Sequence, residues 1–509
     1  MAAHVSVLPI LVLLFGAMLQ IAVARLWPKL THPLAVVTSA GSFVAAVLLA
    51  VRVVRDGAVS YQLGGWSPPW GIELRVDNLS AVMVVMVTAL SLLVLVFAGS
   101  GLAAHLRSRR AYFYSLYLLL TMGMSGMVLT GDLFNLYVFL EVTALASYAI
   151  LGVGDDASPV SAFRYLIIGT LGAMFYLLGI AFVYGITGTL NYADVAERLM
   201  AMGSDGASGP AAVGLALMLA GFGIKAALFP LHIWLPDAYT YAPNVTTAFL
   251  GSVGTKIGAY AIFRVLYTVY GVEQNRIDWP VLEVMGALSA VAIVVGSVLA
   301  IAQTDLKRML AYSSVAQLGY VLLGFSLPNE LGLTGGFLHI LNHALMKCCL
   351  FLATAAIVAR LGHRDIRKLG GLGREMPMTM TAFTIAAISM IGLPPTAGFF
   401  SKWYLVLGAV EAGRWPYVVV ILGSSLLTAV YFFRVLEHAW LRALADPQAR
   451  LQPTSAGGEA FSERRHLLPA GMIAPLVVTG LGIFVLGLAS WPLVEHVIRP
   501  ALPAALGAG

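Results

Sequence analysis

Four lysines, Lys225, Lys256, Lys347 and Lys402, lie inside apolar stretches that otherwise have the composition of membrane-spanning helices. They make up more than half of the seven lysines in the chain. A charge near the middle of a bilayer costs roughly 3 kcal/mol, so these four and a similarly placed acid, Glu141, cost on the order of 15 kcal/mol before compensation. Residues kept at that cost indicate a path for ions or protons.

Two histidines share a helical face with one of these lysines. His339, His343 and Lys347 follow one another at intervals of four residues, which places them on one side of a helix by its 3.6-residue period. Neutral histidine titrates near physiological pH and can pass protons, and a desolvated lysine can release one. The pattern favours a proton relay. The alternative is a structural stripe that only hydrogen-bonds neighbouring helices.

The acid lies about nine residues into the fifth apolar run, too deep for its carboxylate to reach the membrane surface comfortably. Glu141 therefore needs a cationic partner, and we expect Lys225 in that position. Lys256 and Lys402 would complete a chain of titratable groups across the membrane centre. The alternative is a structural Glu141–Lys225 pair that simply holds two helices together.

The composition defines the class of protein that must position these residues. Mean hydropathy is +0.88, 60% of residues are hydrophobic and only 11% are charged. Apolar runs of about 20 residues, each long enough to cross the hydrocarbon, recur along the whole chain with short connections. They are continuous rather than alternating in polarity, so we expect helices. The sequence predicts an all-α polytopic membrane protein with about 14 transmembrane helices.

The distribution of positive charge predicts the orientation of these helices. One alternate set of loops holds 18 of the 30 lysines and arginines, and the other set holds seven. The remaining five lie within the spans. Positively charged loops stay on the cytoplasmic side, and an even number of spans returns the chain to its starting side. We therefore expect both termini on the outer face of the cell membrane.

Two of the expected spans contain proline close to a lysine. Pro230 follows Lys225 in the seventh span, and Pro394 and Pro395 precede Lys402 in the twelfth. Proline breaks a helix because it lacks an amide hydrogen and its ring clashes with the preceding turn. Broken, lysine-bearing helices 7 and 12 in corresponding halves are typical of inverted repeats around an ion path.

We therefore divide the chain into four parts. Residues 1–110 hold helices 1 to 3, with a small hairpin at 58–77 on the outer face, where polarity alternates around a Gly/Pro turn. Residues 111–270 form the first inverted repeat, with helices 4 to 8, and residues 280–445 form the second, with helices 9 to 13. Residues 446–509 hold a linker and helix 14.

Several kinds of chemistry find no support in the residues present. Cys348 and Cys349 are adjacent in one apolar helix and point in different directions, so they predict neither a disulfide framework nor a metal cluster. No Walker A sequence occurs. A nucleic-acid surface would require positive charge clustered on a soluble face. We expect no cofactor, no resident metal and no nucleic acid, so the driving energy must come from an ion gradient or a partner.

Over nearly its whole length the chain resembles the antiporter-like subunits shared by respiratory complex I, membrane-bound hydrogenases and Mrp-type multisubunit Na⁺/H⁺ antiporters. This resemblance implies fourteen helices, two inverted five-helix repeats, broken helices 7 and 12, and a Glu–Lys pair that drives proton transfer. Five segments carry it: Leu133–Glu141, Gly223–Asp237, Asp305–Ser314, Asn342–Lys347 and Gly392–Lys402.

The family pattern also implies roles for individual residues. Glu141 and Lys225 would form the driving pair, and Lys402 would gate the far half-channel. A transient Na⁺ near Glu141 belongs to the same expectation. Gln317 stands where many relatives have a histidine, which leaves that relay position in doubt. The expected proton path comprises Glu141, Lys225, Lys256, His339, His343, Lys347 and Lys402.

Within the family, residues 254–260 and 373–377 are most similar to the D-type component of Mrp antiporters. We therefore expect a proton-translocating subunit of a multisubunit monovalent cation (Na⁺)/H⁺ antiporter, with other membrane subunits as partners and with H⁺ and Na⁺ as the ions moved. The alternative is a proton-pumping membrane subunit of a complex I-like NADH:quinone oxidoreductase or a membrane-bound hydrogenase. A transporter is expected rather than an enzyme, and in the redox-linked alternative the partners would hold the cofactors.

Overall fold

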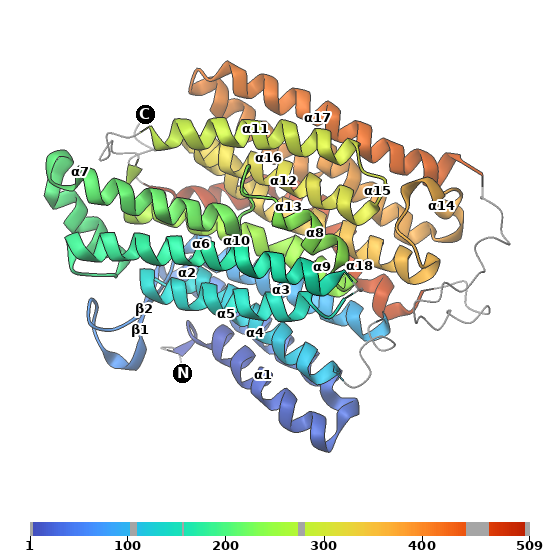
Figure 1. The fold of residues 1–509 in the computed structure, drawn as a ribbon, viewed down its shortest axis with the longest axis horizontal. Helices are drawn as coiled ribbons and strands as arrows, with labels where there is room; N and C mark the ends of the chain where they lie inside the picture. The colour runs from blue at the N-terminus through green and yellow to red at the C-terminus, as the bar shows by residue number, and fades with distance from the viewer. Residues whose placement is uncertain (1–3, 102–108, 155–156, 273–279, 444–467, 504–509) are drawn as a thin grey trace.

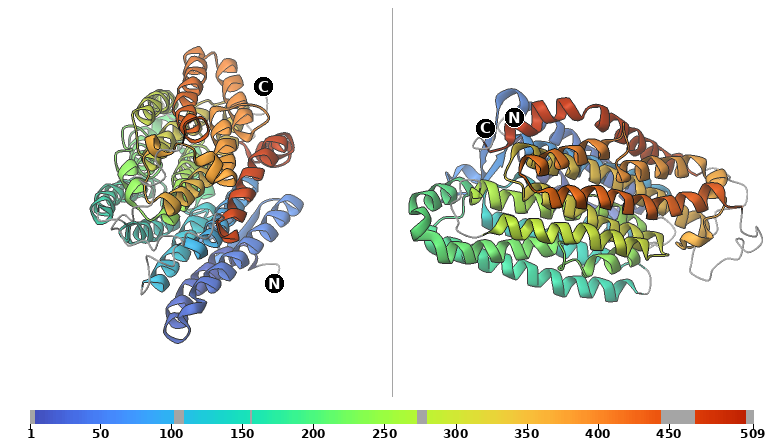
Figure 2. Two further views of the ribbon diagram at one scale, coloured as in Figure 1. Left: turned by 90° about the vertical axis from the view of Figure 1, so that its right-hand side faces the viewer. Right: turned by 90° about the horizontal axis from the view of Figure 1, so that it is seen from above.

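The computed structural model describes residues 4–101, 109–154, 157–272, 280–443 and 468–503. Long helices run side by side along one common direction (Figures 1 and 2). Among the described residues, eleven helices are long and apolar enough to cross a membrane. The predicted class, an all-α polytopic membrane protein, is confirmed.

The count of fourteen spans stays a prediction. Helix α12 (Leu306–Phe325) has the length of a span but is not among the eleven apolar helices. Two further apolar segments, Gly209–Lys225 and Pro377–Ile391, are shorter than a full crossing. Each of these three elements carries or adjoins polar residues, and this polarity lowers the apolar signal on which counting depends.

The N-terminal part contains three long helices and a small sheet. Strands β1 and β2 pair antiparallel, with Val59 opposite Val76, and lie at the end of the bundle where α1 begins (Figure 1). The alternating exposure of β1 is the pattern of a strand with one face against the protein. The elements are α1 (Leu8–Leu26), α2 (Thr31–Asp56), β1 (Val59–Gln62), β2 (Glu73–Val76) and α3 (Asn78–Gly101).

A buried acid joins this sheet to the next part of the chain. The carboxylate of Glu73 accepts hydrogen bonds from the Ser60 hydroxyl at 2.5 Å and from the Asn191 side-chain amide at 2.7 Å. The Glu73 carbonyl accepts from the amide of Gly131 at 2.9 Å. The hairpin is thereby attached to the start of two helices of the first predicted repeat.

The first predicted repeat contains the long helices α4 to α7 and a segmented eighth span. Helix α7 begins well before the apolar run that starts near residue 211, because the Asn191 side chain caps the amides of Ala193 and Asp194. Its first turns are polar, so hydropathy does not mark them. The elements are α4 (Arg110–Leu129), α5 (Leu133–Leu151), α6 (Ser158–Thr187), α7 (Tyr192–Lys225), α8 (Trp234–Tyr241), α9 (Asn244–Phe249), the π-helical η4 (Leu250–Gly254), α10 (Thr255–Phe263) and the π-helical η5 (Arg264–Val269).

The second predicted repeat has a comparable order of helices. Turns separate α15 from α16, and they contain Gly392 and the two prolines at 394 and 395. In the first half, α7 ends at Lys225 and turns containing Pro230 precede α8. The elements are α11 (Val281–Ile301), α12, α13 (Glu330–Leu361), the 3-10 turn η7 (Ile366–Lys368), α14 (Leu372–Glu375), α15 (Pro377–Ile391), α16 (Ala397–Glu411), α17 (Trp415–Leu436) and the π-helical η8 (Glu437–Leu441).

The two halves share a pattern of backbone hydrogen bonds. In each half an aspartate caps a helix, Asp132 for α5 and Asp305 for α12, and a short antiparallel bridge forms beside that cap. This correspondence supports two related repeats, whose limits and inverted relation stay predictions. The amide-to-carbonyl bonds run from Leu133 to Leu190 and from Tyr192 to Gly131 in the first half, and from Leu306 to Arg364 and from Ile366 to Thr304 in the second, all at 2.9 Å.

The last helix returns to the start of the molecule. Helix α18 (Ala470–Leu488) packs against α3, α13 and α15, and α19 (Ser490–Leu493), η10 (Val494–Ile498) and η11 (Arg499–Ala501) follow it. Arg499 forms an ion pair with Glu330 at the start of α13, at 2.5 Å. The two ends of the chain lie at the same end of the bundle (Figure 1). Their side of the membrane stays a prediction, and the predicted linker at 446–465 lies outside the described residues.

Glycines let α6 and α7 approach closely. A Cβ atom on Gly221 would lie 2.5 Å from the carbonyl oxygen of Gly172, and one on Gly179 would lie 2.7 Å from that of Gly214. Both pairs are seven residues apart on their helices, so they form one small-residue seam of the kind that joins membrane helices. Because α7 ends at Lys225, one turn beyond Gly221, this seam fixes where that lysine lies.

Gly221→Ala should destabilise the protein by about 1–3 kcal/mol, because the added methyl meets backbone that cannot yield without moving a helix. The melting temperature of the purified protein in detergent is the measurement. Gly185→Ala in α6 is the matched control, since a Cβ atom there has nothing within 4 Å. Equal melting temperatures for the two variants would show that the seam is not tightly packed.

Candidate functional site

Lys402 is held by the broken end of a helix. Its ammonium donates to the carbonyls of Met390 and Ile391 at 3.0 and 3.1 Å, and to the Ser425 hydroxyl at 3.1 Å. Helix α15 ends at Ile391, so these carbonyls lack partners in a following turn and carry the negative end of the helix dipole. The ammonium also lies 4.9 Å from the ring centre of Tyr320. The break near the two prolines therefore creates the binding site for this cation.

His339 connects three helices near Lys402. Its Nδ1 lies 2.9 Å from the hydroxyl of Ser401 in α16, and its Nε2 lies 2.9 Å from the side-chain oxygen of Gln317 in α12. The ring of His339 also packs 5.5 Å from that of Tyr320. All three hydrogen-bonding residues are fully buried. The imidazole is thus fixed in orientation as well as in position.

His343 and Lys347 continue the same face of α13, as the spacing predicts. The rings of His339 and His343 stack at 5.9 Å with an angle of 14°. Neither ring nitrogen of His343 has a hydrogen-bond partner in the part of the chain that the structure describes. The Lys347 ammonium donates to the Leu310 carbonyl at 2.6 Å and to the Ser313 hydroxyl. The stripe therefore joins α13 to α12.

Lys256 lies at the start of α10, directly after a π-helical turn. Its ammonium donates to the carbonyl of Gly251 at 2.5 Å, and the side chain is completely buried. A π-helical turn is wider than an α-helical one and leaves backbone groups available, which is why such turns are frequent at functional sites. The Lys256 charge acts on His339, His343 and Lys347. These four residues therefore form one electrostatic group.

Lys225 approaches this group from α7. Its ammonium donates to the hydroxyl of Tyr165 at 3.2 Å. A small cavity lies beside it and reaches Gly254, two residues before Lys256. The cavity is lined by Tyr165, Lys225, Trp234, Tyr239, Leu250 and Gly254.

Glu141 does not touch Lys225 in this structure. No ion pair within 4 Å joins them among the described residues, although their charges interact over a longer distance. Tyr148 lies in the electrostatic range of Glu141, and its ring packs 4.8 Å from that of Tyr165, which holds Lys225. Glu141 is half-buried. Two tyrosines therefore connect the expected partners, and the pair as a driving element stays a prediction.

Sequence reasoning missed the groups that hold the lysines and histidines. Tyr148, Tyr165 and Ser401 are types that occur throughout apolar helices, so nothing in their spacing marked them. Gln317 offered a signal, because an amide inside an apolar run needs a polar neighbour. Among the described residues, no group of three or more His, Cys, Asp or Glu side chains could hold a metal ion.

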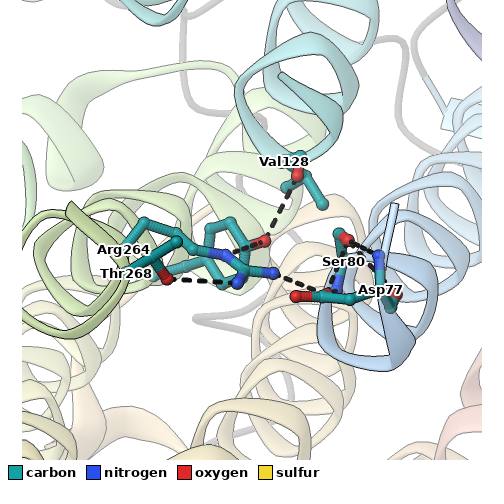
Figure 3. Close-up of polar contacts among 6 residues, drawn as sticks. Asp77, Ser80, Val128, Arg264 and Thr268 are labelled. Atoms are coloured by element: carbon teal, nitrogen blue, oxygen red, sulfur yellow. Dashed lines mark hydrogen bonds and ion pairs between the residues drawn. The ribbon is translucent and has the colours of Figure 1, made fainter. Parts of the chain in front are cut away.

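A second buried charge was counted within the spans but given no role. Arg264 at the start of η5 donates to the Asp77 carboxylate at 2.5 Å, and its Nε donates to the Tyr260 hydroxyl at 2.7 Å (Figure 3). The Tyr260 hydroxyl donates in turn to the Val128 carbonyl at 3.2 Å. Burial alone would raise the pKa of Asp77, but the Arg264 charge and the hydrogen bonds from Arg264 and Ser80 bring this pKa below its usual value. The pair fastens the start of α3 to the eighth span.

The fold and these side chains define a polytopic membrane protein with a buried row of lysines and histidines between its two halves. Residues 130–428 match the family described as NADH:quinone oxidoreductase/Mrp antiporter, TM. Residues 63–112 match the family described as NADH-Ubiquinone oxidoreductase (complex I), chain 5 N-terminus. The chain belongs to this antiporter-like family of ion- and proton-transporting membrane proteins, which is located in the cell membrane.

Individual relatives come from both branches of the family. The N-type component of the NADH-quinone oxidoreductase of Desulforudis audaxviator is 48% identical, over 99% of this chain and 99% of its own. The D-type component of the Na⁺/H⁺ antiporter of Alkalihalophilus pseudofirmus is 31% identical, over 91% and 89%. A chain in the solved Mrp complex from Dietzia sp. DQ12-45-1b has a TM-score of 0.84 and 28% identity, over 98% and 96%. The similarity therefore extends over the whole fold.

Asp77→Asn should destabilise the protein by about 3–5 kcal/mol, because it leaves the buried Arg264 without a counter-charge. The additional change Arg264→Gln should restore part of this loss, since the double variant buries no unpaired charge. Thermal unfolding of the purified protein measures both effects. Asp56→Asn is the control, because the Asp56–Arg52 pair is exposed and such pairs contribute little. A double variant no more stable than Asp77→Asn alone would contradict the explanation.

Proposed function

We propose that this chain is a proton-translocating membrane subunit whose protons move through its buried row of lysines and histidines. One observation carries the proposal: in the part of the chain that the structure describes, none of the four lysines of this row has a carboxylate within 4 Å. Their ammonium groups bind only carbonyl and hydroxyl oxygens. The path comprises Glu141, Lys225, Lys256, His339, His343, Lys347 and Lys402.

The absence of close carboxylates suits a lysine to proton exchange. A carboxylate in contact would hold the charge in place, whereas neutral oxygen acceptors can bind the amine in either protonation state. Lysine releases its proton when buried, which arginine does not do. A lysine that gains a proton also disfavours protonation of the next one, because like charges repel in a medium of low dielectric. Protons can therefore advance along the row by mutual repulsion.

The two helix breaks lie at the ends of this row. Lys225 is the last residue of α7, and Lys402 binds the last carbonyls of α15. We propose that Glu141 and Lys225 form the driving pair and that Lys402 gates the far half-channel. This arrangement corresponds to two inverted repeats, residues 111–270 and 280–445, that meet at the row. Interrupted helices at a repeat interface are typical sites of ion transport.

The first candidate for the energy source is a gradient of a monovalent cation. In this form the chain is the proton-translocating subunit of a multisubunit Na⁺/H⁺ antiporter, with Na⁺ passing transiently near Glu141 and both termini on the outer face. The relatives named as D-type components of Na⁺/H⁺ antiporters and the similar chain in the Mrp complex support this candidate. Its partners are other membrane subunits of the same assembly.

The second candidate is a redox-driven complex. The 48% identity to a protein named as the N-type component of an NADH-quinone oxidoreductase, over the full length of both chains, favours it. In this form other subunits hold the redox cofactors, and this chain contributes only the proton path. The same buried row serves either energy source, because protons respond to local charge and not to its origin.

Glu141→Gln and Lys225→Met should each lower proton transport by about a hundredfold or more, since each removes a group that takes up and releases protons. Dye-monitored transport by the complete complex in vesicles is the measurement, normalised to the amount of subunit. Glu283→Ala and Lys29→Ala are matched controls, because both side chains lie on the exposed surface. Normal transport in both site variants would overturn the proton path.

Purification of the tagged chain from its native membranes separates the two energy sources. Small hydrophobic antiporter subunits, together with proton movement driven by a Na⁺ gradient, are expected for the first candidate. Iron–sulfur or flavin proteins, together with proton movement driven by an electron donor, are expected for the second. Proton movement that depends on a redox donor and not on Na⁺ would eliminate the antiporter assignment.

A further inference from the structure

The amide of Gln317 faces one nitrogen of His339. Its oxygen lies 2.9 Å from Nε2, and an amide oxygen can only accept a hydrogen bond. The hydrogen of a neutral His339 must therefore be on Nε2. Its bare Nδ1 then accepts from the Ser401 hydroxyl, 2.9 Å away. Because all three side chains are fully buried, bulk water cannot make either contact in their place.

The same three residues allow a second, equally consistent arrangement. The two ends of an amide are nearly the same size, so a half-turn of Gln317 would present its NH₂ group to Nε2. Nε2 would then be bare, and Nδ1 would carry the hydrogen and donate to Ser401. The Ser401 hydroxyl would keep a partner, since the carbonyl of Gly398 lies 3.2 Å from it. The two arrangements contain the same number of protons and differ only in their location.

Gln317 itself is not fully satisfied in the first arrangement. Its NH₂ group is buried and has no hydrogen-bond partner in the described part of the chain. An unpaired buried donor is rarer and less favourable than a carbonyl oxygen without a partner. The half-turn would give the NH₂ group an acceptor and leave the oxygen unpaired instead. This compensation brings the two arrangements close in free energy.

We propose that Gln317 is a positioning residue that selects the tautomer of His339 and thereby decides which side of the ring can receive a proton. The inference deepens the proposed function, and it rests on that function only for its effect on transport. With the amide oxygen toward the ring, the basic nitrogen of His339 faces Ser401, the residue before Lys402. With the amide turned, the basic nitrogen faces Gln317 and is closed to that side.

The link to Lys402 follows from the geometry. Lys402 follows Ser401 in α16, and its charge acts on His339. A proton that leaves the Lys402 ammonium, which becomes a neutral amine, converts His339 to an imidazolium with hydrogens on both nitrogens. The Ser401 hydroxyl then donates to Gly398, and Nε2 still donates to Gln317. The reverse transfer restores both groups, so the first arrangement keeps His339 open to exchange with this lysine.

The test is the tautomer of His339 measured by ¹⁵N NMR of the complete complex with labelled histidine. A His339→Gln sample identifies the signals by difference. Gln317→Met removes the acceptor and keeps the size of the side chain, so the ratio of Nδ1–H to Nε2–H should rise about tenfold, the ratio that one hydrogen bond is worth. Gln317→Glu offers only acceptor oxygens and should keep the hydrogen on Nε2. Gln20→Met is the matched control, because Gln20 is also fully buried and also has an unpaired amide atom.

The outcomes separate this proposal from the proposed function. A tenfold change in the ratio, with transport lowered about tenfold in the same vesicles, supports both. An unchanged ratio in Gln317→Met overturns tautomer selection, whatever the transport rate. A changed ratio with normal transport supports the selection and removes His339 from the proton path. If Gln317→Met does not assemble, Gln317→Asn withdraws the same oxygen by one methylene and should give the same change in ratio.

Discussion

A buried ammonium group needs oxygen atoms around it, and in this protein those oxygens come mainly from interrupted helices. An unbroken α-helix uses its carbonyls internally and has none to offer. Lys402 therefore binds the end of α15, and Lys256 binds a carbonyl of the π-helical turn just before it. The irregular parts of the backbone are consequences of the charges that they surround. Moving a lysine would leave such a turn with unpaired carbonyls, so the two features depend on each other.

Charges without close counter-ions can influence one another over longer distances. Lys256 acts on both histidines and on Lys347, while Lys402 acts on His339 from the opposite side. Direct ion pairs would cancel these interactions locally, because a bound carboxylate neutralises the field of the cation. The protein contains such pairs elsewhere, as Arg264 and Asp77 demonstrate. The separation of the two kinds of site suggests a division of labour, in which closed pairs hold helices together and open lysines carry protons.

The division also explains how a proton path can be both rigid and responsive. The helices are fixed by glycine contacts between α6 and α7, by capped helix starts and by the Arg264–Asp77 pair. Within that frame, the proposed movements are only the transfer of protons and the rotation of small groups such as the Ser401 hydroxyl and the Gln317 amide. Such movements require little rearrangement of packed helices, whose close packing resists larger changes.

The sequence by itself determined the class of protein, the positions of the helix breaks and the face on which His339, His343 and Lys347 lie. These features depend on local properties: the length of apolar runs, the missing amide hydrogen of proline and the period of the helix. Only the tertiary structure decided which oxygens hold each lysine, that Glu141 and Lys225 are not in contact, and that His339 lies between Gln317 and Ser401. Those two partners are 22 and 62 residues away from it along the chain. Such contacts arise where separate helices pack together, and the period of a single helix carries no information about the register of its neighbours.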